Sequence, residues 1–107
     1  MTIGQYDIVL VNLDPTIGSE IRKTRPCVVL SPDEMNRHLR TVVIAPITST
    51  DKDYPTRVRV DHAKITGRIA IDQIRTIDRQ RVVRTLGTLK AATIARCKQV
   101  LQETFVD

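Results

Sequence analysis

The sequence predicts an α+β, mostly β protein in which a small barrel or twisted antiparallel sheet is covered by one C-terminal α-helix. Short runs rich in Val, Ile and Leu recur along most of the chain, and Gly, Pro and polar residues separate them, as in small folds built from strands. The last segment changes to the spacing of an amphipathic helix. At 107 residues, we expect one domain, residues 1–107, with one modest core.

Three strands are predicted in the first half of the chain. The first run stops at Asp14-Pro15, which is a turn signal. The second run follows Pro26. We expect this proline at the first position of the strand, because the missing N–H of a proline destabilises a sheet least at the start of a strand or at an edge. The predicted strands are residues 6–13 (YDIVLVNL), 27–30 (CVVL) and 41–46 (TVVIAP).

A short helix is predicted between the second and third strands, over about residues 32–38. Ser31 is suited to the N-cap position and Pro32 to the first helical position. Glu34 then stands where a capping box places its acidic residue.

The second half contains further short strands. Residues 57–60 (RVRV) alternate strictly between polar and apolar, which predicts a strand with one face in water. Residues 67–71 (GRIAI) are predicted to continue as an extended segment to Ile77, and residues 82–86 form the last short strand.

The C-terminal segment is predicted to be an amphipathic helix. Ile94, Cys97, Leu101 and Phe105 recur at helical steps and form one apolar stripe. Thr88, directly after Gly87, is the predicted N-cap.

The charge balance favours a polyanionic partner. Seventeen Lys and Arg residues against twelve Asp and Glu give a net charge of +5, which suits nucleic acid because phosphate contacts release counterions. Aromatic residues make up only 3% of the chain and Trp is absent. This argues against a broad base-stacking platform and favours binding through Lys, Arg and backbone groups.

The two cysteines are predicted to be core residues. Cys27 lies in an apolar strand and Cys97 on the apolar face of the last helix, and no CxxC or Cys/His cluster is present. We therefore expect no metal site and no cofactor. We also expect a cytoplasmic protein with no membrane partner, since no secretory signal and no apolar run of about 20 residues is visible.

One stretch, RKTRPCVVLS, raises a functional question. Arg25 stands at the entrance to a predicted buried strand, and Pro26 restricts the backbone beside it. The simpler interpretation is a solvated loop that leads into a strand. The alternative is that Arg25 is held in place because it acts on a negatively charged group.

Several segments together resemble one family. DIVLVNLDPTIGSE, RPCVVLS, VVIAPITS, GRIAIDQIRTIDRQR and LGTL occur in the order and spacing of MazF/PemK/Kid-type toxins, and the resemblance covers nearly the whole chain. It implies an SH3-like barrel (MazF/CcdB-like) with a C-terminal helix, and a homodimer. It also implies sequence-specific cleavage of single-stranded RNA, including mRNA, without a metal, and inhibition by an acidic, partly disordered antitoxin.

The resemblance implies that Arg25 and Thr48 are the catalytic residues. Arg25 falls in the Arg-Pro motif of the family and Thr48 in its Pro-Ile-Thr-Ser motif. Metal-free cleavage uses the ribose 2′-OH as nucleophile, so the site must stabilise charge on the phosphoryl oxygens. Arginine loses a proton only above about pH 12, so we assign Arg25 to charge stabilisation, with proton donation to the leaving oxygen as a second role. Glu20 is a candidate base, and the alternative is a solvated loop acid.

The segment 14–24 is the expected specificity loop. Ser19 and Glu20 can read base edges, and Arg22 and Lys23 can hold phosphates. Ile21 departs from the family, in which a polar Gln is common at this position. That departure leaves the base preference open and would also fit an apolar contact with the antitoxin.

A second shared motif contains Asp72-Gln73. We consider two roles for this pair: contact with RNA, or a buried hydrogen-bond network within the barrel. Some Kid-like members have an Arg two residues before this Asp and use both in cleavage, but this chain has Ala70 there. A mechanism that needs this Arg does not apply here, so Arg25 and Thr48 remain the expected catalytic residues.

Two other functions are weighed against a toxin endoribonuclease. A catalytically silent nucleic-acid-binding module would share the basic charge. A gyrase poison like CcdB would share the fold and size, but such toxins rely on a C-terminal tail containing Trp, which this chain lacks. The charge-rich stretch from Arg75 to Arg81 is interpreted as a solvated face or part of the dimer interface, and not as catalytic.

Overall fold

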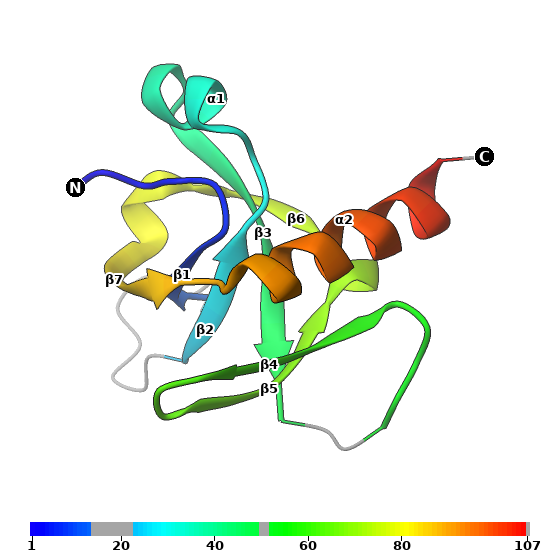
Figure 1. Cartoon of the computed structure of the whole chain (residues 1–107). Helices are drawn as coiled ribbons and strands as arrows, with labels where there is room; N and C mark the ends of the chain where they lie inside the picture. The colour runs from blue at the N-terminus through cyan, green and yellow to red at the C-terminus, as the bar shows by residue number, and fades with distance from the viewer. Residues whose placement is uncertain (14–22, 50–51, 107) are drawn as a thin grey trace.

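The computed structural model describes residues 1–13, 23–49 and 52–106. Within them a curled antiparallel sheet carries one long helix across it, with a shorter helix at one end (Figure 1). The strands are β1 (Asp7–Asn12), β2 (Thr24–Val29), β3 (Thr41–Thr48), β4 (Arg57–His62), β5 (Ile65–Ala70), β6 (Arg75–Asp78) and β7 (Val82–Thr88). The helices are α1 (Asp33–His38), α2 (Ala91–Phe105) and the 3₁₀ turns η1 (Ile71–Gln73) and η2 (Arg79–Arg81).

The sheet has seven strands in the order β4-β5-β3-β2-β1-β7, with β6 paired to β3 outside this path. The start of β3 pairs with β6, and its end pairs with β5. Because β3 takes part in both pairings, the sheet curls around it into a partly closed barrel. The predicted fold class is therefore confirmed.

Alternation along the strands produces two apolar clusters, one on each face of the sheet. One lies beneath α2 and includes Ile8, Val28 and Ile69, and the other includes Val9, Cys27 and Ile44. The expectation of one modest core was therefore wrong, because a curled sheet encloses apolar residues on both of its faces. No helix in the described ranges is long and apolar enough to span a membrane.

The helix α2 has the predicted apolar stripe, except at its end. Cys97 and Val100 are fully buried, and Ile94 and Leu101 pack against the same cluster. Phe105 is 59% exposed, because the last turn of α2 extends past the edge of the sheet (Figure 1). The predicted apolar stripe therefore packs on the sheet through Ile94, Cys97 and Leu101, but not through Phe105.

Strand β2 begins three residues earlier than predicted. Thr24, Arg25 and Pro26 pair with β1, whereas the pairs between β2 and β3 run from Cys27 to Val29. Pro26 is thus the third residue of the strand and not the first. It is tolerated because this part of β2 has a paired neighbour on one side only.

The short helix forms, but without the predicted capping box. Pro32 is its N-cap and no side chain caps it. Ser31 is buried, and its hydroxyl accepts a hydrogen bond from Val43 N at 3.0 Å and donates one to the buried side chain of Asn36. The hydroxyl therefore satisfies interior polar groups instead of the helix end.

Other element boundaries also differ from the predictions. Strand β3 continues through Ile47 and Thr48, because β5 pairs with both. The extended segment predicted to reach Ile77 is interrupted by η1. Thr88 belongs to β7 and its hydroxyl donates to Asp7 at 3.0 Å, so Lys90 takes the N-cap position of α2.

Both cysteines should resist thiol reagents in the folded protein. Cys27 and Cys97 are fully buried, and burial raises the pKa of Cys27 to about 12 and of Cys97 to about 11. Because the thiolate is the reactive species, Ellman's reagent at neutral pH should release almost no chromophore until denaturant is added, and then two equivalents per chain. Rapid reaction of either thiol without denaturant would contradict this burial.

Candidate active site

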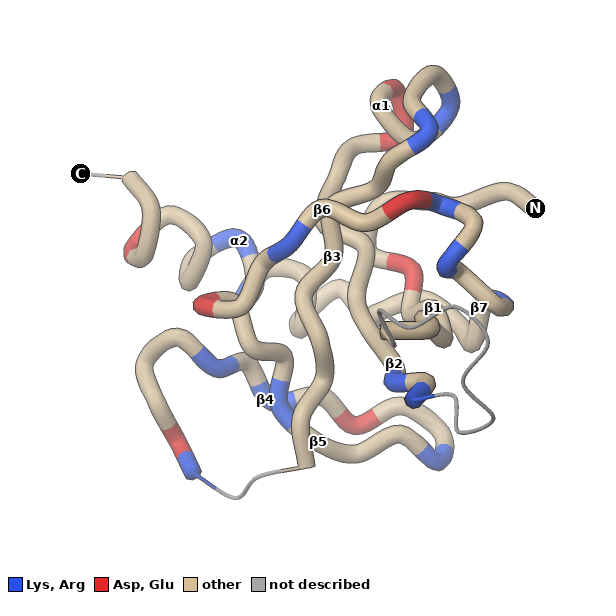
Figure 2. The backbone as a smooth tube through the Cα atoms, turned by 180° about the vertical axis from the view of Figure 1, so that it is seen from behind, with Lys and Arg blue, Asp and Glu red and all other residues tan. Residues whose placement is uncertain are grey.

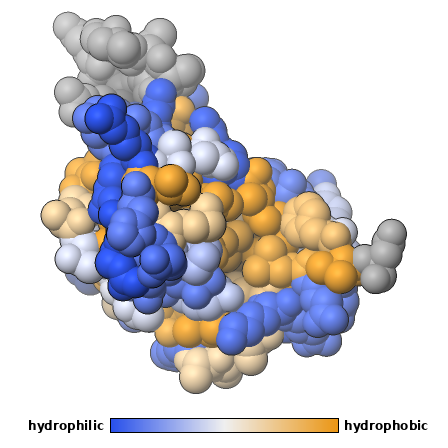
Figure 3. Space-filling model, turned by 90° about the horizontal axis from the view of Figure 1, so that it is seen from above, coloured by the Kyte–Doolittle hydropathy of each residue, from blue (hydrophilic) through white to orange (hydrophobic). Residues whose placement is uncertain are grey.

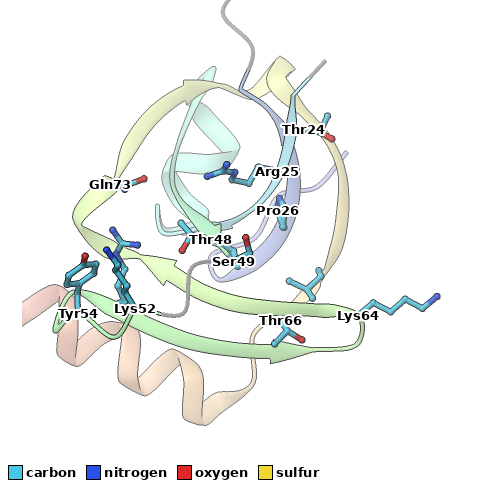
Figure 4. A pocket seen from close by; sticks show the side chains of 13 residues that line it. Thr24, Arg25, Pro26, Thr48, Ser49, Lys52, Tyr54, Lys64, Thr66 and Gln73 are labelled. Carbon is cyan, nitrogen blue, oxygen red and sulfur yellow. The ribbon is translucent and has the colours of Figure 1, made fainter. Parts of the chain in front are cut away.

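An open pocket of about 830 Å³ lies where the start of β2 and the end of β3 meet the β4–β5 hairpin. Figure 4 shows Arg25 reaching into it from β2, with Thr48 and Ser49 below it and Gln73 on the far side. Tyr54 and Lys52 border one end of the pocket. The pocket therefore collects residues from parts of the chain that are distant in sequence.

The pairing of β2 with β3 brings Arg25 and Thr48 together. Cys27 pairs with Pro46 at the end of this antiparallel ladder. Arg25 and Thr48 each lie two residues beyond that pair and therefore face the same side of the sheet as Cys27 and Pro46. Directly opposed residues share a face of the sheet. Arg25 and Thr48 therefore project from the same face, and both line the pocket.

Thr48 is fixed by its neighbour strand. It pairs with Arg68 of β5, and its hydroxyl donates a long hydrogen bond of 3.5 Å to the Arg68 carbonyl. Gly67 packs so closely beneath Thr48 that a Cβ there would collide with the Thr48 carbonyl. The hydroxyl is thus held on a strand and remains half-exposed to the pocket.

The described pocket lining is cationic. It includes the side chains of Arg25, Lys52, Arg57 and Lys64, and no Asp, Glu or His. Figure 2 shows basic residues (blue) along the β4–β5 hairpin and at the start of β2, around the same end of the sheet. A site of this composition favours a phosphate-containing ligand.

Gln73 and Asp72 lie in different surroundings. Gln73 lines the pocket, whereas Asp72 is exposed and binds Arg57 at 2.8 Å and Thr56 at 2.9 Å. The alternative of a buried network is therefore wrong for Asp72, because η1 places this side chain at the surface, beside the start of β4. The hydrogen bond from Arg57 lowers the pKa of Asp72, burial opposes this, and the bond from Thr56 adds to the lowering, so the carboxylate is ionised at neutral pH.

Sequence reasoning missed Arg57 as a site residue. It is the first residue of β4, pairs with Ala70 and lines the pocket. The alternating RVRV run predicted that Arg57 faces solvent, but only the strand pairing shows that this arginine stands beside Ala70 and reaches the pocket. Lys52, Tyr54 and Lys64 were missed as well, because their loops carry no periodic signal.

Part of the predicted specificity loop lies outside the described residues. This applies to Ser19, Glu20 and Arg22. Lys23 is described and exposed, does not line the pocket, and accepts a hydrogen bond from Leu13 N at 3.0 Å through its carbonyl.

The charge-rich stretch has structural contacts. Arg79 donates to the Asn36 carbonyl at 2.6 Å and to the Met1 carbonyl at 3.3 Å, and Asp78 caps η2 by accepting from Gln80 N. These contacts tie α1 and the N-terminus to η2. None of these residues lines the pocket.

Comparisons with known proteins identify the family and the fold. The family model described as PemK-like, MazF-like toxin of type II toxin–antitoxin system matches residues 4–105. The chain is similar to Endoribonuclease EndoA of Bacillus subtilis (strain 168), with 33% identity over 95% of this chain and 93% of that protein. It is also similar to Endoribonuclease toxin MazF of Escherichia coli (strain K12), with 35% identity over 83% and 77%. A crystal structure of MazE–MazF from Deinococcus radiodurans superposes with a TM-score of 0.84, at 28% identity over 96% of this chain and 95% of that one.

Proposed function

The chain belongs to the PemK-like, MazF-like toxins of type II toxin–antitoxin systems, and on this premise we propose that it is an endoribonuclease that cuts single-stranded RNA without a metal ion. The observation that carries the proposal is the shared placement of Arg25 and Thr48 on one sheet face in a cationic pocket. Relatives over most of the chain are named endoribonucleases. The sequence specificity of the cut is part of the same proposal.

The proposed reaction begins when the ribose 2′-oxygen attacks the adjacent phosphorus and loses its proton. The bond from phosphorus to the 5′-oxygen then breaks, the 5′-oxygen takes up a proton, and the products carry a 2′,3′-cyclic phosphate and a 5′-OH. Charge grows on the non-bridging oxygens during attack. The planar guanidinium of Arg25 and the hydroxyl of Thr48 are suited to donate hydrogen bonds to them.

The base that removes the 2′-proton is a separate question. The described lining of the pocket contains no carboxylate and no imidazole, and arginine is a poor base because it keeps its proton to above about pH 12. Glu20, outside the described residues, stays the candidate from the sequence. Arg25 is assigned to charge stabilisation and to protonation of the leaving oxygen.

RNA binding is proposed to extend beyond the two catalytic residues. Gln73 lines the pocket and its amide can both donate and accept, as base-edge reading requires. Lys23 lies exposed two residues before Arg25, a position suited to a neighbouring phosphate. Ser19 and Arg22 keep their predicted roles in the specificity loop.

We further propose two protein partners. An acidic, partly disordered antitoxin fits the net charge of +5 and the cationic pocket. A second copy of the chain fits the exposed apolar side chains, which include Phe105 and Val106, and Figure 3 shows hydrophobic surface (orange) gathered on the face of the molecule seen from above. A sedimentation experiment should give twice the chain mass, and a monomer at micromolar concentration would contradict the dimer.

The function is tested by mapping RNA ends. Brief induction in cells, followed by sequencing of cut RNA, should give 5′-OH ends at one short recurring sequence, and the purified protein should cut the same sequence in the presence of EDTA. Strict dependence on added divalent metal would contradict the mechanism. Binding without turnover would favour a silent nucleic-acid-binding module, and inhibition of gyrase without RNA cleavage would favour a gyrase poison.

A further inference from the structure

Arg57 occupies an unusual position for a surface arginine. It lines the pocket, yet only 11% of its side chain is exposed. The pairing of β5 with β3 and β4 explains which face of the sheet Arg57 projects from. Thr48 pairs with Arg68 and Arg57 pairs with Ala70, so Arg57 shares a sheet face with Thr48, while the row formed by Ile47, Val58 and Ile69 lies buried on the other face.

The guanidinium of Arg57 is held on one edge only. Its Nε and Nη2 bind the two carboxylate oxygens of Asp72 at 2.8 and 3.3 Å, and its centre lies 5.2 Å from the centroid of the Tyr54 ring. Thr56 donates to Asp72 at 2.9 Å and so fixes the carboxylate as well. The remaining nitrogen of the guanidinium, Nη1 of Arg57, has no hydrogen-bond partner among the described residues.

This arrangement is suited to bind an anion. An arginine whose rotamer is already fixed loses little conformational entropy on binding, and it presents Nη1 as a charged donor of fixed direction. Asp72 is ionised and offsets part of the charge, but Arg25, Lys52 and Lys64 keep the lining positive.

Arg57 and Arg25 enter the pocket from strands that are not neighbours in the sheet. Strands β5 and β3 lie between β4 and β2, which is three strand spacings or roughly 14 Å. Two arginines that stand on strands this far apart suit different phosphates of one RNA strand that crosses the end of the sheet.

We propose that Arg57 is a second phosphate-binding arginine of the pocket, which holds a phosphate other than the scissile one, and that Asp72 is the residue that positions it. The proposal rests on the function proposed above. Arg57 then contributes to substrate affinity, whereas Arg25 and Thr48 act on the reacting phosphate.

The test uses Arg57→Gln with Arg68→Gln as the matched control. Arg68 has a similar exposure of 16% and a similar ion pair, with Asp53 at 2.6 Å, but it does not line the pocket. Binding is measured by anisotropy with a short 2′-O-methyl oligonucleotide of mixed sequence, which lacks the nucleophile and is not cut. The salt concentration is varied between about 50 and 200 mM.

Arg57→Gln should weaken binding roughly tenfold and reduce the slope of log K against log salt by about 0.7, the value for one phosphate contact on a single strand. In cleavage assays KM should rise by a similar factor, with kcat within about threefold of the wild type. Arg68→Gln should leave affinity and slope unchanged. Unchanged affinity and slope in Arg57→Gln, or equal losses in both variants, would overturn the proposal.

Two further variants separate charge, orientation and folding. Asp72→Asn keeps the charge of Arg57 but holds its side chain less firmly. The affinity for the oligonucleotide should therefore fall, with no change in the slope of log K against log salt. If Asp72→Asn bound with wild-type affinity, Asp72 would not be a positioning residue. If Arg57→Gln lowers the melting temperature more than Arg68→Gln does, Arg57→Lys replaces it and should bind more weakly with an unchanged slope. A wild-type protein that cuts no RNA would contradict the proposed function, whereas the oligonucleotide comparison would still decide on Arg57.

Discussion

Replacement of Arg25 by Ala should lower kcat for RNA cleavage by about 100- to 1,000-fold, the range found when one donor to a developing oxyanion is removed. The reason is that Arg25 places a charged planar donor at the pocket, on the same sheet face as Thr48, and the other β2 residues of the pocket lining, Thr24 and Pro26, carry no charge. Single-turnover cleavage of an RNA containing the mapped cut sequence, in EDTA, measures the effect.

The stability of the protein should be unaffected by this change, because Arg25 is exposed and its described strand contacts are made by the backbone. Arg84→Ala is the control: Arg84 is an exposed arginine on β7, outside the pocket lining, and its loss should leave kcat within about twofold of the wild type. Cleavage by Arg25→Ala within tenfold of the wild type would remove Arg25 from the catalytic role.

Replacement of Gly67 by Ala should damage both stability and activity. A Cβ at Gly67 would meet the Thr48 carbonyl at less than 3.0 Å and would touch Ile47, so β5 and the end of β3 must separate. Overpacking of this kind costs about 1–3 kcal/mol in the free energy of unfolding, which corresponds to a fall in melting temperature of roughly 5–20 °C. Because Thr48 must move, kcat should also fall by about 10- to 100-fold.

Gly4→Ala serves as the comparison for Gly67→Ala. The nearest atom to a Cβ at Gly4 is a side-chain oxygen of Asp7, at 3.2 Å, and a side chain can adjust where a strand carbonyl cannot. We expect a loss of less than about 1 kcal/mol and unchanged kcat. If Gly67→Ala melted within about 2 °C of the wild type and cut RNA normally, the close packing of β5 on Thr48 would be contradicted.

The sequence supported correct predictions wherever the signal was local. The run CVVL after Pro26 and the helical spacing of Ile94, Cys97 and Leu101 predicted their elements because apolar residues in strands and helices follow recognisable local patterns. The predictions failed where a group that is distant in the sequence forms the contact that the local pattern assigns to a neighbour. Ser31 has the local pattern of an N-cap, but the backbone of Val43 and the side chain of Asn36 bind its hydroxyl instead.

The candidate site shows the same difference between residues with a local signal and residues whose contacts come from distant segments. The motifs identified Arg25 and Thr48, and each stands on a strand whose apolar pattern can be read directly. They did not identify Arg57, because its role depends on three contacts from other segments: Asp72, Tyr54 and the pairing with Ala70.

The sequence by itself therefore determined the strand-rich fold with its terminal helix, the basic charge of +5 and the two residues expected to act on the scissile phosphate. Only the tertiary structure decided that Arg25 and Thr48 share a face, that Asp72 is exposed, and that a second arginine lies across the pocket. The physical reason is that periodicity records whether a residue faces apolar surroundings. The register of non-local strand pairs, which no local pattern encodes, decides which residues meet.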